Sequence, residues 1–434
     1  MGCILIFLKI EKCIILISLA LFFLFFQSNT YAFSYEAPLT LAEAERLAIL
    51  TAPELKQLQA TADSLKEQAV ADGQLSDPQL IVGAANVPTN SFSFTQDDMT
   101  MLQIGLQQTF APGHSLAMKS KKTRALAKAE EQKLREQMAM LLRNVREAWL
   151  DLYYWKQAAS IIHENQSLFK RLLQVKQSEY SAGRDTQSTL LQLRVELSRL
   201  NDQSVQIDQR IDVLRAQLGR WIGSNEANRP LFERLPHWTN PPELTILRSR
   251  LIKHPLLKID TEKIEAARNE VAFATEQYKP GWTVDVGYGV RQGTYMDGSG
   301  KSRSNFVGAQ LTIDLPFFTS NRQTKRLEAS QHQLVATELD RDVHYKDLLK
   351  ELSIQYAIWK SLNKRASMYR QHLYPEAKQN SKAALLAYKN TTIDLSTVLR
   401  AYSNELTIRL EQTQIQVDRA KTRAALLYLQ GVTS

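Results

Sequence analysis

Apolar residues recur along most of the chain at the alternating three- and four-residue spacing of long amphipathic helices. Residues 118–181 keep this spacing without a proline, which predicts one helix about 95 Å long at 1.5 Å per residue. After Gly183, residues 186–222 predict a second helix, so the two are expected to form an antiparallel coiled-coil hairpin. The apolar seams are Leu134, Met138, Leu141, Val145, Ala148, Leu152, Trp155, Ala159 and Ile162 on the first helix, and Leu190, Leu193, Leu197, Leu200, Ile207, Ile211, Leu214, Leu218 and Trp221 on the second.

The chain repeats this plan once. Ala52-Pro53 recurs 202 residues later as His254-Pro255, and Tyr180 recurs 208 residues later as Tyr388. We therefore predict the order helix, two strands, long helix, turn and final helix in each of two repeats. The predicted units are a signal peptide at 1–32, a first repeat at 33–223, a linker at 224–241 and a second repeat at 242–434.

The remaining helices are expected at 45–72 in the first repeat and at 244–277, 321–389 and 394–431 in the second. Pro375 is expected to bend the helix that contains it. In each repeat the opening and final helices together match the long helix in length. They are therefore predicted to stack end to end along it.

Four short segments switch to a period of two, with apolar residues alternating with polar residues or glycine. They lie near residues 80–84, 102–107, 282–290 and 306–315. Strands of this kind are typical of a transmembrane barrel, although a soluble half-buried sheet gives the same alternation. Long polar loops at 88–99 and 292–304, together with an export signal, favour the barrel.

Four strands cannot close a barrel, because about eight are needed and an open sheet edge is not viable in lipid. Two copies would give eight strands with a filled interior, whereas three would give twelve strands around a pore. We therefore predict a homotrimer in contact with outer-membrane lipid.

The export signal comprises a charged start, a 13-residue apolar core at 14–26 and the small-x-small sequence Thr30-Tyr31-Ala32. As a helix, the core rises only about 20 Å, too little to span a hydrocarbon layer of roughly 30 Å. We predict that the mature chain begins at Phe33, against the alternative of a retained anchor. Mass spectrometry of the purified protein is expected to give this N-terminus; a mass that retains Cys13 would contradict the prediction.

The composition of the chain excludes several classes of function. Glycine and proline total only 29 of 434 residues, which suits long uninterrupted helices. Both cysteines, Cys3 and Cys13, lie in the signal, so the mature chain has no thiolate for catalysis or metal binding. The seven histidines show no pairing at helical metal-ligand spacing. The net charge of +9, or +8 after signal removal, is interleaved along helical faces, which argues against nucleic acid. Neither an enzyme nor a cofactor is expected.

The plan resembles the TolC family of outer-membrane efflux channels. The order of the similar stretches, duplicated 202 to 208 residues apart, is more specific than any one stretch. Residues 101–120 look closest to the heavy-metal cation branch. The similar stretches are LTLAEAERLAILTAPEL, LSDPQLIVGAANVP, EYSAGRDTQSTLLQLR and AYKNTTIDLSTVLRAY.

The resemblance implies a mainly α fold with a transmembrane β part. Duplicated long helical hairpins would form a periplasmic tunnel, and each chain would add four strands to a trimeric 12-stranded barrel. It also implies passive conduction of metal cations or drugs from an inner-membrane pump of RND or ABC type, through a periplasmic adaptor (membrane fusion) protein. The alternatives are a type I secretion duct and a periplasmic coiled-coil adaptor or scaffold.

Two hairpin tips are the candidate adaptor-docking sites. The first tip is similar to a Val-Gly-Leu element of the family, but Arg184 replaces the apolar third residue, and the second tip lacks the glycine. Gly183 as a mere helix terminator is the alternative. The tip residues are Ala182, Gly183 and Arg184, then Asn390, Thr391 and Thr392.

A pore aperture is expected just inside the tips. Where the family carries acidic rings, this chain has Thr189, Thr397 and Arg400, so Asp185 and Asp394 are the candidate replacements. They could form a cation-selective ring or a latch with Arg184 or Arg400. The alternative to a role in the pore is that Asp185 and Asp394 cap the helices that follow the two turns.

Overall fold

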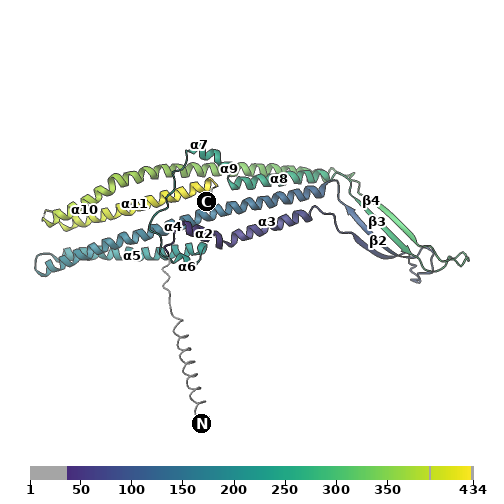
Figure 1. Cartoon of the computed structure of the whole chain (residues 1–434), viewed down its shortest axis with the longest axis horizontal. Coiled ribbons are helices and arrows are strands. Elements are labelled where there is room, and N and C mark those ends of the chain that lie inside the picture. Colours follow the sequence, from purple (N-terminus) through teal and green to yellow (C-terminus); the bar gives the residue numbers. More distant parts are fainter. Residues whose placement is uncertain (1–36, 391, 432–434) are drawn as a thin grey trace, which may run out of the picture.

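The computed structural model describes residues 37–390 and 392–431. The predicted signal peptide, the Phe33 terminus and Thr391 lie outside these residues. The chain forms a long rod, with a four-stranded sheet at one end and two helical hairpin tips at the other (Figure 1). The mainly helical fold with a small β part is therefore as predicted.

The two repeats contain the same order of elements. The first comprises α2 (Leu41–Thr51), α3 (Pro53–Ala71), β1 (Gln79–Ala85), β2 (Met101–Phe110), α4 (Ser115–Ser181) and α5 (Gln187–Ile222). The linker carries the single turn α6 (Ser224–Ala227). The second comprises α7 (Leu244–Leu251), α8 (Pro255–Glu276), β3 (Trp282–Val290), β4 (Phe306–Ile313), α9 (Gln323–Met368), the π-helical turn η1 (Tyr369–Leu373), α10 (Tyr374–Lys389) and α11 (Leu395–Leu429).

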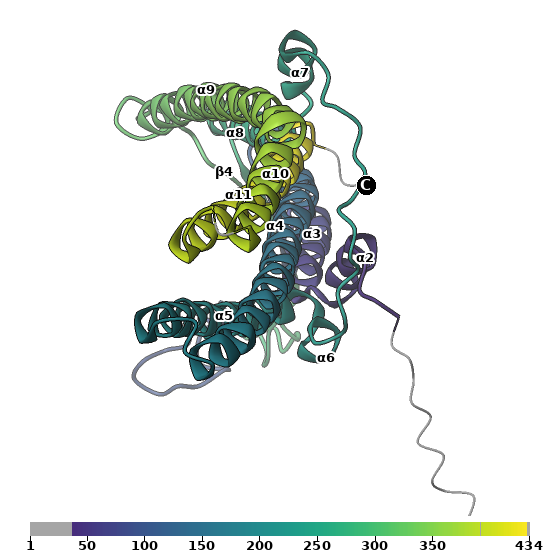
Figure 2. The same ribbon diagram turned by 90° about the vertical axis from the view of Figure 1, so that its left-hand side faces the viewer.

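Each opening helix, predicted as one piece, is broken at the repeated proline. Pro53 and Pro255 are the first residues of α3 and α8, and the residues before them are extended, with ψ of 108° at Ala52 and 136° at His254. Proline has no N–H and disfavours a helical conformation in the residue before it, so one helix cannot continue through it. As a result α2 and α7 lie to the side, on the convex face of the molecule (Figure 2).

Only the second piece of each opening helix continues the line of the final helix. Thr51 Oγ1 donates a hydrogen bond to the carbonyl of Trp221 at 2.8 Å, which joins the end of α5 to the break between α2 and α3. In the second repeat the ring of Tyr428, near the end of α11, lies 5.2 Å from that of His254 at the start of α8. End-to-end stacking along the long helix therefore occurs in both repeats.

Pro375 has a local effect that differs from a simple bend. The helix widens into η1 just before it, where the N–H of Tyr374 bonds the carbonyl of Tyr369, five residues back. The missing N–H of proline leaves a helical carbonyl without its donor, and a π turn accommodates that loss. The long helix of the first repeat, α4, has no such turn.

The predicted apolar seams form the main core. Val145, Leu152 and Ile162 of α4 pack with α5 residues such as Leu193 and Leu218, all almost fully buried. Residues of α10 and α11 join the same cluster, including Ala384, Val398 and Val417. The two hairpins thus pack against each other.

The sheet is antiparallel in the order β1-β2-β3-β4, with neighbours in sequence also neighbours in space. The register places the predicted apolar residues in rows on one face: Val82 opposite Ile104, Ile104 opposite Tyr288, and Tyr288 opposite Val307. This face is exposed on the single chain, to 71% at Val82 and 76% at Val307. The opposite face carries mainly glycine and polar residues.

Candidate functional site

The first hairpin tip is a glycine-dependent helix terminus. Gly183 has φ of +70°, its N–H donates to the carbonyl of Tyr180, and the N–H of Arg184 donates to the carbonyl of Glu179 at 2.8 Å. This pair of bonds is the Schellman motif, in which glycine avoids the steric cost of a left-handed backbone. A Cβ built on Gly183 would meet nothing within 4 Å, so the outer side of the tip is open.

The second tip closes with one matching bond. Asn390 is the C-cap of α10, and the N–H of Thr392 donates to the carbonyl of Ala387 at 3.0 Å, as that of Arg184 does to Glu179. Thr391, which occupies the position equivalent to Gly183, lies outside the described residues.

The residues after the two turns cap α5 and α11. Asp394 caps α11, accepting a bond from the N–H of Thr397, whereas α5 is capped by Thr186, whose hydroxyl accepts from the N–H of Thr189. Hydrogen bonds from Ser396 and Thr397 lower the pKa of Asp394 to about 2. Capping is therefore the observed role of Asp394, while the capping alternative for Asp185 is wrong, because Thr186 occupies that position.

Asp185 instead forms an ion pair that the sequence analysis did not anticipate. Its carboxylate lies 2.7 Å from Nζ of Lys176, which also contacts Glu179 and sits 4.8 Å from the ring centre of Tyr388 on α10. Lys176 thus joins the turn of the first hairpin to the second hairpin. The sequence signal was present: Ile162, Phe169 and Lys176 follow at heptad spacing, so the lysine occupies a core position.

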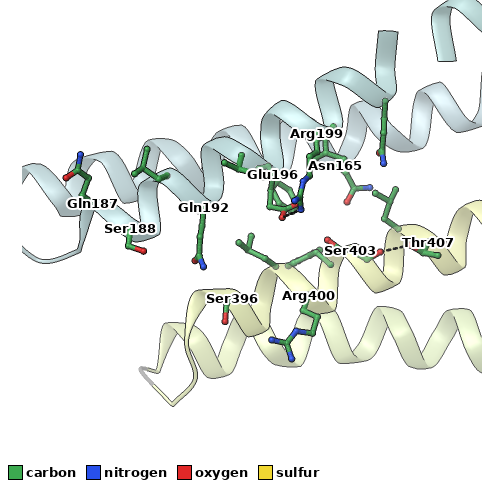
Figure 3. Close-up of a pocket in the computed structure, with 18 residues that line it drawn as sticks. Asn165, Gln187, Ser188, Gln192, Glu196, Arg199, Ser396, Arg400, Ser403 and Thr407 are labelled. Carbon is green, nitrogen blue, oxygen red and sulfur yellow. Dashed lines mark hydrogen bonds and ion pairs between the residues drawn. The ribbon is translucent and has the colours of Figure 1, made fainter. Parts of the chain in front are cut away.

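The latch expected between an aspartate and Arg184 or Arg400 does not form within this chain. Asp185 pairs with Lys176, and neither arginine makes an ion pair with a carboxylate in the part of the chain that the structure describes. Arg400 instead lines a cleft of 1070 Å³ between α5 and α11, with α4 residues Asn165 and Phe169 also lining it (Figure 3). Ser188 lines the same cleft.

Lys176→Met is expected to loosen the tips. It leaves the largely buried carboxylate of Asp185 without its cation, at a cost of about 3 kcal/mol, and removes the contact with Tyr388. If the chain forms the channel predicted from the sequence, we expect the variant to show higher single-channel conductance in planar bilayers. Lys350→Met, which breaks a solvent-exposed pair with Asp347, is the control and should change nothing. Unchanged conductance in the Lys176 variant would show that the pair does not restrain the tips.

The pKa values of Asp185 and Lys176 determine the pH range over which their ion pair stabilises the tip. Burial alone would raise the pKa of Asp185, but bonds from Lys176 and from the N–H of Thr186 lower it below the ordinary 3.8. Burial alone would lower the pKa of Lys176, but the hydrogen bonds to Asp185 and Glu179 outweigh this effect and raise it. A carboxyl group with a lowered pKa stabilises the tip fully at pH values above its ordinary pKa. This stabilisation is lost as the pH falls through the lowered pKa. The pair is therefore charged at neutral pH, and its contribution is lost below the lowered pKa of Asp185 and above the raised pKa of Lys176.

Neither a membrane-spanning helix nor a metal cluster is found in the described residues. No helix there has an apolar stretch long enough to cross a membrane. No group of three or more histidine, aspartate or glutamate side chains there could hold a metal ion.

The second repeat carries the family assignment. Residues 247–432 match the family described as outer membrane efflux protein. Over this repeat the chain is similar to outer membrane efflux proteins. The family resemblance predicted from the sequence is thereby confirmed. A comparison with curated protein sequences gives no match.

Solved structures of outer-membrane proteins share the fold over both repeats of this chain. VceC from Vibrio cholerae matches 90% of this chain and 96% of its own, with a TM-score of 0.74 and 17% identity. CmeC from Campylobacter jejuni matches 91% and 86%, with a TM-score of 0.74 and 14% identity. CusC matches 90% and 91%, with a TM-score of 0.73 and 15% identity. At these identities, the likeness shows the fold.

The outer-membrane location, the role of the helical part as a periplasmic tunnel and the lack of an enzymatic role stay predictions from the sequence. The similarity of residues 101–120 to the heavy-metal branch stays a prediction, as do the tip and aperture residues and the boundaries of the repeats.

Proposed function

We propose that three copies of this chain form an outer-membrane efflux channel that passively conducts substrates to the exterior. An inner-membrane pump of RND or ABC type and a periplasmic adaptor would deliver them, with metal cations or drugs as the substrate classes. The observation that carries the proposal is the exposed apolar face of the four-stranded sheet, which suits lipid.

The edges of the sheet support assembly. β1 and β4 each pair on one side only, so a single chain would leave backbone N–H and C=O groups without partners in lipid. Joining β4 of one copy to β1 of the next satisfies both edges. Three copies then give a closed barrel of about twelve strands, which is wide enough for a pore.

The helices also present apolar residues that a single chain leaves uncovered. On α9, Val335, Leu339 and Val343 are each more than half exposed and recur every four residues, so they share one helical face. Such a stripe on a helix is typical of packing against another helix. A neighbouring copy at the end of the arc in Figure 2 would cover it.

The tips are the proposed adaptor-docking surface. They lie at the end of the rod opposite the sheet (Figure 1), which is the end that a periplasmic partner would reach first. The open surroundings of Gly183 leave its backbone accessible to a partner.

A detergent-stable trimer that conducts ions is the expected result of purification in mild detergent. Light scattering coupled to chromatography gives the mass of the protein part, and planar bilayer recording tests conduction. The physical reason is that monomers would expose both sheet edges. A monodisperse monomer with intact β-sheet circular dichroism would contradict the proposal.

A further inference from the structure

The linker crosses the middle of the helical rod (Figure 1) on its convex side (Figure 2). Linker residues line two adjoining crevices there. One has a volume of 220 Å³ and the other of 80 Å³. Both are lined by Leu235 of the linker and by Gln416 and Arg419 of α11, so they form one continuous site. We call it the arginine crevice, after Arg370, Arg419 and Arg423, which line it.

No carboxylate among the described residues balances the charge of the arginine crevice. No aspartate or glutamate is among the residues that line it. None of its three arginines forms an ion pair with a carboxylate in residues 37–390 or 392–431. Other arginines near the linker do have partners: Arg146 pairs with Glu45 at 2.6 Å, and Arg229 pairs with Glu43 at 2.9 Å.

Arg423 is the most constrained of the three. Its side chain is 8% exposed, and its Nε donates to the carbonyl of Thr239 in the linker at 2.8 Å. Its Nη1 is buried and has no hydrogen-bond partner among the described residues. Burial, and then the charge of Arg146, lower the pKa of this guanidinium. A buried cation without a counter-charge is costly, so an anion beside it would be stabilising.

The other two arginines are placed to share such an anion. Arg419 and Arg423 are four residues apart on α11 and therefore lie on the same helical face. Arg419 makes only a long contact from Nη1 to Oδ1 of Asn363, at 3.4 Å. Arg370 belongs to η1, the π-helical turn, and π turns recur at functional sites.

We propose that the arginine crevice binds an oxyanion, either a phosphate group or a carboxylate. Guanidinium groups match the oxygen geometry of both through paired N–H donors. The bound anion would neutralise Arg423 and Arg419 together. Because Arg423 also holds the linker carbonyl of Thr239, binding would fasten the linker that joins the two repeats to α11. This site is separate from the tips and the barrel, so it does not depend on the proposed channel function.

Isothermal titration calorimetry of the full-length protein in detergent tests the proposal, with inorganic phosphate in one arm and acetate in the other, both at constant ionic strength set with chloride. Saturable binding of one anion per chain is expected. Binding of phosphate alone would assign a phosphate group, and binding of acetate alone a carboxylate. No saturable binding of either anion would overturn the proposal.

Arg419→Gln is the informative variant, because this exposed side chain is not required for packing. It is expected to weaken the binding at least tenfold. Arg210→Gln, an exposed arginine on α5 that lines neither crevice, is the matched control and should bind as the unaltered protein does. Equal binding by the Arg419 variant would place the anion elsewhere and also overturn the proposal. Thermal denaturation in phosphate gives a second measurement. A rise in Tm that is identical in the Arg419→Gln and Arg210→Gln variants would be a general salt effect and would contradict the proposal.

Discussion

Gly183→Val is expected to abolish export while leaving the trimer intact. The residue has φ of +70°, and a β-branched side chain at this backbone conformation costs about 1–2 kcal/mol locally. That cost is small beside the burial along α4 and α5, and a Cβ at this position meets no atom within 4 Å, so folding should survive. The same open space is where a docking partner would approach the backbone, and a branched side chain would obstruct it.

The measurements are efflux-dependent resistance, cross-linking to the adaptor and the yield of trimer. Thr391→Val in the second tip is the matched control, because it replaces one β-branched residue with another, and it should be much milder. Normal resistance and cross-linking in the Gly183 variant would reduce the glycine to a helix terminator. Loss of the trimer would show that the turn contributes to assembly.

Ile104→Arg is expected to prevent insertion into the outer membrane. Ile104 lies in the middle of β2, between Val82 and Tyr288 in the register, and is 50% exposed on the apolar face. An arginine near the middle of the bilayer on the lipid face of a barrel costs about 2–4 kcal/mol. A trimer incurs this cost in each of its three chains. We expect little trimer in the outer-membrane fraction.

Gln103→Arg tests the same chemistry on the other face. Gln103 is the neighbouring residue of β2 and points to the opposite side of the sheet because side chains alternate along a strand. This variant should insert normally, since an arginine facing a wet pore keeps its hydration. Normal insertion of Ile104→Arg with failure of Gln103→Arg would mean that the two faces are assigned the wrong way round.

The sequence alone was sufficient for the helical hairpins and the strands. Helix α4 was predicted at 118–181 and lies at Ser115–Ser181, and β3 lies at Trp282–Val290 as predicted. Both rest on periodic burial: a helix that buries one stripe, or a strand that buries one face, must repeat its apolar residues at a fixed interval. Gly183 was likewise readable, because few other residues tolerate its positive φ.

The candidate site could be predicted only in part from the sequence, because capping depends on which residue the backbone places at the start of the helix. Asp394 caps α11, but Thr186 takes the equivalent position at α5, which leaves Asp185 to pair with Lys176. The two partners are nine residues apart on either side of a turn. Their meeting, and the contact of Lys176 with Tyr388 on the other hairpin, depend on how the hairpins pack.

Sequence periodicity by itself determined the two repeats, the coiled-coil seams and the alternating strands, since these patterns record burial within single elements. The tertiary structure decided what lies between elements. It set α2 and α7 aside at Pro53 and Pro255, it brought Lys176 to Tyr388, and it placed Arg370 and Arg423 of different helices under one linker. Those contacts join residues far apart in the chain, and their distances follow from the packing of whole helices, which no local pattern encodes.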